Sequence, residues 1–307
     1  VTFPKIAVWF CFLWLHQEAI GQVNPTNWPI PGTPKGGLST QLLQSRTYAR
    51  SIENQLDNIE KRYPDLKTQV FLSRCAWLAS PFASGCQAIE DDIVKKMGDE
   101  GRVFLARLDK KTFEETKKLV PAFNREEAVD FLQLTHRRAK GEIEVEMVRA
   151  NLLWQHKPYQ KSPEREYSDG YGTSVKHTAN RDIAVKFNVP MSWKMEKSPR
   201  KELMVFRNCY GHGNVWMTVT VRPTVDDYGK EISSDLAFSN YSHAGLKAIY
   251  EGMGITLTSF TKTKVNKMPA LLFTRKQPYE QLGTKALRAA EVVRVFNNDY
   301  MIAFQIN

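Results

Sequence analysis

The chain has 307 residues, of which 42% are hydrophobic and 25% charged, and its formal net charge is +10. This composition is typical of soluble globular protein, and a chain of this length is expected to form about two domains. The composition excludes a disordered chain that is too polar to form a hydrophobic core. After the N-terminal residues, no apolar stretch is long enough to span a membrane.

Residues 1–21 have the layout of a secretory signal peptide. Lys5 precedes an apolar run over residues 6–15, and Ala19 and Gly21 are small residues at the spacing that a signal peptidase recognises. The run is shorter than the roughly 20 residues that a membrane helix requires. We therefore expect export to the periplasm or the extracellular space, with no transmembrane segment after cleavage. The alternative is a buried hydrophobic strand or helix.

Residues 22–37 contain four prolines and three glycines, which favours an extended tether. Residues 38–155 then have the period of helices. Apolar residues spaced three and four apart predict a helix that Pro64 ends, and further helices are expected over residues 66–78 and 88–97. Capping boxes at Thr112 and Asn124 predict two more helix starts, and a last helix is expected over residues 143–154. The first half is therefore expected to be an all-helical domain.

Residues 156–180 are rich in proline, glycine and polar residues, and we interpret them as a linker between domains. From residue 181 the apolar period changes to two, which is typical of strands. Strands are expected over residues 183–189, 203–206, 215–221, 255–261, 268–275, 289–296 and 300–306, with a helix over 241–252. The pattern predicts an α+β domain with an antiparallel sheet covered by helices.

The stretch "FNVPMSWKM" raises the question of why a strand should end at Pro190 and Trp193. Proline has no backbone N–H to donate to a neighbouring strand, so strand pairing ends there. We expect the side chain of Trp193 to fold back into the core. The stretch "NVWMTVTVRPTVDDYG" and further strands follow later in the sequence. In this order of strands, residues 181–307 resemble the PsbP-like family. The motifs that carry the resemblance are Pro190-x-x-Trp193 and Asp227-Tyr228-Gly229. The resemblance implies a sheet between helices and a role in binding or assembly. It transfers no catalytic residue to this chain.

The cysteines allow two interpretations. Pro81 and Gly85 lie between Cys75 and Cys86, so the chain could turn back and form a disulfide in an oxidising compartment. The alternative is a pair of buried thiols in a helical hairpin. Cys209 is expected to be a small core residue. Cys209 and His212 form a single close pair of metal-binding types, which is too few for a zinc site.

Positive charge is concentrated in the second half of the chain. Residues 22–155 contain 20 Lys and Arg against 18 Asp and Glu, whereas residues 156–307 contain 22 against 14. Five cations on a predicted hairpin could form a surface for an anionic partner, or a charged edge that prevents sheet aggregation. They are Lys262, Lys264, Lys267, Arg275 and Lys276.

The sequence therefore favours an exported, non-enzymatic binding or assembly protein. Its expected partner is a protein or an anionic component of the cell envelope, and nucleic acid is not expected. We expect no cofactor, metal or catalytic residue. The alternative hypothesis is a secreted hydrolase or toxin-like effector with a site between the domains, in which Cys209 with His212 or His243 would be the first residues to consider.

Overall fold

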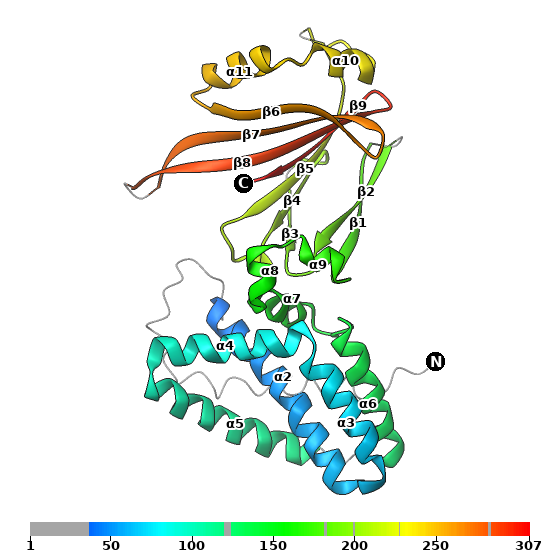
Figure 1. Cartoon of the computed structure of the whole chain (residues 1–307), viewed down its shortest axis with the longest axis vertical. Helices are drawn as coiled ribbons and strands as arrows, with labels where there is room; N and C mark the ends of the chain where they lie inside the picture. Colours follow the sequence, from blue (N-terminus) through cyan, green and yellow to red (C-terminus); the bar gives the residue numbers. More distant parts are fainter. Residues whose placement is uncertain (1–36, 120–123, 181–182, 199, 227, 282–283) are drawn as a thin grey trace. The chain divides into compact units, whose positions relative to one another are not determined.

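The computed structural model describes residues 37–307 except 120–123, 181–182, 199, 227 and 282–283 (Figure 1). The expected signal peptide and nearly all of the expected tether lie outside the described residues. The chain forms two compact units, a helical unit up to Gly172 that also includes Pro190–Ser192, and a sheet unit made of Thr173–Val189 and Trp193–Asn307.

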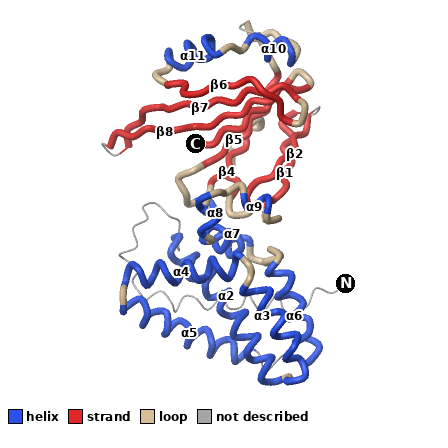
Figure 2. Tube along the Cα trace, in the orientation of Figure 1, coloured by secondary structure: helices blue, strands red, loops and turns tan. Residues whose placement is uncertain are grey.

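The helical unit is built from helices of very different length (Figure 2). They are α2 (Gly37–Arg62), the 3-10 turn η2 (Pro64–Leu66), α3 (Lys67–Leu78), α4 (Pro81–Met97), α5 (Asp99–Leu119), α6 (Arg125–Ala139), α7 (Glu146–Gln155), α8 (Lys157–Lys161) and α9 (Arg165–Ser168). Their apolar faces form a core that contains Ile52, Trp77 and Phe131, each fully buried. The helical character expected for the first half is confirmed.

One of the two expected capping boxes is confirmed. The Asn124 side chain accepts a hydrogen bond from the backbone N–H of Glu127, and the Glu127 carboxylate accepts one from the N–H of Asn124, at the start of α6. The helix start expected at Thr112 is wrong. Thr112 lies inside α5, and its carbonyl accepts a hydrogen bond from the Thr116 hydroxyl. A capping pattern occurs there because Thr and Glu are also tolerated within a helix.

Helices α4 and α7 pack closely because Gly85 has no side chain. A Cβ at this position would lie 2.0 Å from the carbonyl oxygen of Leu152 on α7. Leu152 and its neighbour Leu153 are fully buried, so α7 can hardly move away. The fold therefore requires glycine at residue 85 for close backbone approach.

The described residues of the sheet unit form nine strands and two α-helices. They are β1 (Gly172–Asn180), β2 (Ile183–Pro190), β3 (Lys194–Glu196), β4 (Leu203–Arg207), the 3-10 turn η4 (Cys209–Gly211), β5 (Trp216–Pro223), α10 (Ser234–Asn240), α11 (His243–Gly252), β6 (Thr256–Val265), β7 (Met268–Gln281), β8 (Thr284–Asn297) and β9 (Tyr300–Ile306). Seven strands form an antiparallel sheet in the order β3-β4-β5-β9-β8-β7-β6, while β1 and β2 pair separately. The expected α+β class is thus observed.

The two faces of the seven-stranded sheet are covered differently (Figure 1). On one face, Leu246 of α11 and Ala237 of α10 pack with Phe273 and Val292 of the sheet. On the other, Phe187 of β2 packs edge-on against Phe206 and Phe304. Alternating side chains thus form a core on each face.

The stretch around Pro190 and Trp193 behaves as expected. Strand β2 ends at Pro190, and Trp193 is buried with Val189 and Phe206 in the core under β4 and β5. Residues 156–180, which we expected to be a linker between domains, contain α8, α9 and strand β1, and the division between the two units at Gly172 and Thr173 falls within them. Pro158 stands in the first turn of α8, where its missing N–H is not needed.

Replacing Gly85 with alanine should lower the free energy of unfolding by about 3 kcal/mol, because the added methyl group collides with backbone. Chemical denaturation of the full chain measures this change. Gly252→Ala is the matched control, since a Cβ on this residue of α11 meets no atom within 4 Å. We expect it to be neutral or slightly stabilising. Equal stability of the two variants would contradict the packing.

Candidate anion-binding site

Three arginines lie on the helix-covered face of the sheet. Arg275 is on β7, and Arg288 and Arg294 are on β8. Arg275 is paired with Ala290, and residues two apart on a strand share a face. All three arginines therefore lie on the face that also carries Val292 and supports α10 and α11.

Aromatic rings lie against each of these guanidinium groups. The guanidinium carbon of Arg288 is 4.8 Å from the ring centroids of both Trp216 and Tyr279. That of Arg275 is 5.5 Å from the ring of Tyr250 on α11, and Arg294 lies near Tyr241 at 5.4 Å. Cation–π attraction holds the guanidinium groups in place without neutralising their charge. Arg294 also donates a hydrogen bond to the Tyr250 hydroxyl at 3.3 Å.

Arg275 and Arg288 line a pocket of about 200 Å³, which we call the arginine pocket. Its lining residues include both arginines and come from β5, β7, β8 and β9, except Asn307, which follows β9. They are Trp216, Arg275, Gln277, Arg288, Ala290, Gln305 and Asn307. These lining residues include two cations, three amides and no Asp or Glu. The pocket is therefore electropositive.

Two hydrogen-bond donors in the arginine pocket have no partner among the described residues. Gln305 donates from Nε2 to Oδ1 of Asn307 at 2.6 Å, which leaves Asn307 Nδ2 buried without an acceptor. Arg275 Nε is also buried without an acceptor. Within the described part of the sheet unit, the ion pairs are Arg207–Glu196 and Lys247–Glu251, and neither includes Arg275 or Arg288. The pocket thus offers donors and positive charge together.

The five cations expected on one hairpin surface are not brought together. Lys262 donates from Nζ to the carbonyl oxygens of Phe238 and Ser239, where it satisfies the C-terminal end of α10. Lys264 lies on exposed β6 near the turn that holds Lys267. Arg275 and Lys276 stand at the other end of the hairpin and, as neighbours on a strand, on opposite faces. Of the five, Arg275 alone lines the arginine pocket.

Sequence reasoning missed Arg288, Trp216 and Asn307. The expected strands stopped at residue 275 and resumed at 289, whereas β7 extends to Gln281 and β8 begins at Thr284. Arg288 therefore fell outside both expected strands. The alternation of Arg275 and Gln277 is the one local signal that both side chains share a face.

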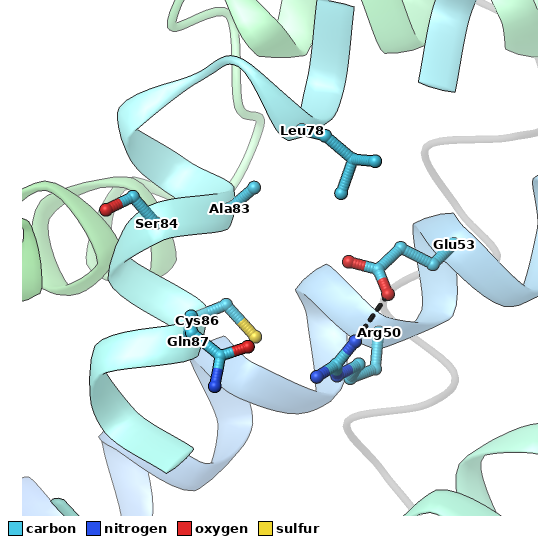
Figure 3. Close-up of a pocket in the computed structure, with 7 residues that line it drawn as sticks. All are labelled: Arg50, Glu53, Leu78, Ala83, Ser84, Cys86 and Gln87. Carbon is cyan, nitrogen blue, oxygen red and sulfur yellow. Dashed lines mark hydrogen bonds and ion pairs between the residues drawn. The ribbon is translucent and has the colours of Figure 1, made fainter. Parts of the chain in front are cut away.

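A second pocket, of about 220 Å³, lies in the helical unit and is shown in Figure 3. It is lined by Arg50, Glu53, Leu78, Ala83, Ser84, Cys86 and Gln87. Arg50 pairs with Glu53 at 2.6 Å and with Glu90 at 2.5 Å. This cation is already neutralised, so the second pocket does not attract an anion.

The hydroxyl of Ser84 is 2.9 Å from Nδ1 of His156, an arrangement that sequence reasoning did not find. Burial lowers the pKa of His156, which favours the neutral ring that a general base needs. In the described residues, no carboxylate accepts a hydrogen bond from this ring, so a triad is not formed. Figure 3 also shows the Ser84 hydroxyl directed away from the space between Leu78 and Arg50.

All three cysteines in the described residues are free thiols, so the possible Cys75–Cys86 disulfide is not formed. Cys75 lies on the exposed side of α3, whereas Cys86 is buried in α4 next to α2. The alternative of two buried thiols is also wrong for Cys75. Burial raises the pKa of Cys86 and of Cys209 to about 12, so both stay protonated and are poor nucleophiles at neutral pH.

Glu166 is a fully buried carboxyl group that the sequence did not single out. Its Oε1 accepts a hydrogen bond from the Ser192 hydroxyl at 2.5 Å, and its Oε2 accepts one from the Ser192 N–H at 3.2 Å. Burial raises the pKa of Glu166 to about 7, although the hydrogen bonds from Ser192 oppose the shift. The carboxyl group therefore changes charge near neutral pH.

The described residues contain no group of three or more His, Cys, Asp and Glu placed to hold a metal ion. Among the helices of this part of the chain, none combines the length and apolar content needed to cross a bilayer. Neither a scan against protein-family models nor a search of curated proteins finds a match to the chain.

Replacing Glu166 with glutamine should make stability less dependent on pH. A carboxyl whose folded pKa is raised to about 7 costs nothing below its unfolded pKa near 4.5; its cost grows as pH rises from 4.5 to 7 and stays constant above that. Relative to the unsubstituted chain, Glu166→Gln should gain on the order of 3 kcal/mol between pH 4.5 and pH 8. Urea unfolding at each pH measures this gain. The exposed Glu164→Gln is the control, and parallel curves for all three proteins would contradict the assignment.

Alkylation of the native protein with iodoacetamide should modify Cys75 and spare Cys86 and Cys209, because only Cys75 of these three is exposed. Peptide mass mapping after digestion identifies the modified residues. All three should react after unfolding in urea without reductant. A peptide pair linked through Cys75 and Cys86 would instead show that the disulfide forms.

Proposed function

We propose that the protein is an exported, non-catalytic binding or assembly protein whose sheet unit binds an anionic partner. One observation carries the proposal: Arg275 and Arg288 line a pocket without any acidic side chain in it, while aromatic rings hold them in place. Arginines that only aid solubility have no need of such fixed geometry. A preorganised guanidinium binds an anion with little loss of side-chain freedom.

The charge of the second half supports the same proposal. Residues 156–307 carry 22 Lys and Arg against 14 Asp and Glu, so the sheet unit attracts anions over a distance as well as at the pocket. The PsbP-like resemblance of residues 181–307 also favours binding and assembly. The partner that fits these features is an acidic protein or an anionic component of the cell envelope.

The geometry favours binding over hydrolysis. The buried thiol of Cys209 stays protonated at neutral pH, which removes the first nucleophile that the alternative hypothesis requires. The Ser84–His156 pair has a hydrogen bond but no orienting carboxylate among the described residues. Neither residue lies in the arginine pocket.

Binding of the full chain to two anionic probes tests the proposal. The probes are immobilised poly-glutamate and vesicles that contain an anionic lipid, each measured at low and high salt. We expect binding that weakens with salt, and at least a fivefold loss of affinity in the double variant Arg275→Gln, Arg288→Gln. The control is Lys264→Gln, Lys276→Gln, which removes equal charge from exposed positions. Absence of binding to both probes, or equal losses in the two double variants, would overturn the proposal.

A further inference from the structure

The arginine pocket has the features of a site for one small group rather than for an extended surface. Its volume of about 200 Å³ corresponds to roughly seven water molecules at the volume each occupies in the liquid. We infer that the arginine pocket binds the phosphoryl group of a small phosphate monoester. This inference rests on the proposed anion-binding function and names the chemistry of the ligand.

The unpartnered donors identify an oxyanion as the ligand. Arg275 Nε and Asn307 Nδ2 are both buried at the pocket, and neither has an acceptor among the described residues. A buried donor without an acceptor is costly, and a ligand oxygen at this place removes the cost. Nε2 of Gln305 donates a hydrogen bond to Oδ1 of Asn307, so Nδ2 of Asn307 is the amide atom that remains to donate to a ligand.

The charge of the pocket matches two negative charges. Arg275 and Arg288 contribute two positive charges, and no Asp or Glu is among the lining residues. A carboxylate ligand would neutralise one of these two positive charges. A phosphate monoester carries close to two negative charges above its second pKa near 6, so it would neutralise both. Guanidinium groups also match phosphate oxygens with two parallel N–H bonds. A dianionic phosphate monoester therefore satisfies both the charge and the donors.

The orientation of Arg288 supports the same ligand. The rings of Trp216 and Tyr279 lie 4.8 Å from its guanidinium carbon and hold the group in place. Because rings contact the face of a guanidinium, the N–H groups at its edge remain available to phosphate oxygens. Trp216 is itself a lining residue, so the ring and the cation it holds meet at the pocket.

Calorimetric titration of the full chain with glycerol phosphate tests the inference. Inorganic phosphate shows whether the phosphoryl group alone is enough, and acetate and dimethyl phosphate are monoanionic controls. We expect glycerol phosphate to bind at least tenfold more tightly than either control, and more tightly at pH 8 than at pH 5, because the ligand gains its second charge near pH 6. Equal affinity for acetate, or affinity that does not rise with pH, would overturn the inference.

Variants locate the binding in the arginine pocket. Arg275→Gln, Arg288→Gln should weaken glycerol phosphate binding at least tenfold, while Lys264→Gln, Lys276→Gln should leave it unchanged. Asn307→Ala keeps both arginines and removes one donor, so it should weaken binding severalfold even if the double arginine variant does not fold. Full affinity in Asn307→Ala, or full affinity in a folded double arginine variant, would overturn the inference.

The two proposals can fail separately. If poly-glutamate or anionic vesicles bind the chain while glycerol phosphate gives no heat of binding, the anion-binding function stands and the phosphate site is rejected. If none of these probes binds, both proposals are rejected.

Discussion

The buried guanidinium of Arg46 is the constraint on which the helical unit depends. Arg46 on α2 is fully buried, and it donates to Glu90 on α4 at 2.8 Å and to Asp109 on α5 at 2.6 Å. A buried charge that loses its partner destabilises a protein by about 3 to 5 kcal/mol. The three helices must therefore keep the arrangement in which both carboxylates reach Arg46. Since Arg50 shares Glu90, the same network also neutralises the pocket shown in Figure 3.

The buried arginines of the helical unit and the two arginines of the arginine pocket are held in different ways. In the helical unit, carboxylates neutralise Arg46, Arg50 and Arg138, and the last of these pairs with Glu144 at 2.7 Å. In the sheet unit, aromatic rings hold Arg275 and Arg288 without removing their charge. A guanidinium held by a carboxylate serves the fold, because its charge and donors are used within the chain. A guanidinium held by a ring keeps both for a ligand, which is why the candidate site lies in the sheet unit.

The sequence predicts most of what depends on local pattern. Helix α3, the cap at Asn124 and the burial of Trp193 follow from spacing, capping and alternation within a few residues. The arginine pocket could not be predicted in this way. The arginine pocket requires two strand registers, one that pairs Gln277 with Arg288 and one that pairs Val292 with Gln305. Because these registers join residues that are distant in the sequence, a local pattern does not reveal them. The exposure of Cys75 likewise depends on which helices cover α3, which spacing alone does not determine.

Gly85 has a consequence for recognising relatives of this chain. The contact between residue 85 and the backbone of Leu152 is a condition that any chain with the same helix crossing must meet. A distant sequence that aligns glycine here, with a serine five residues before it and a short helix about 65 residues after it, is compatible with this packing. One that aligns a larger residue must place the helices that correspond to α4 and α7 farther apart.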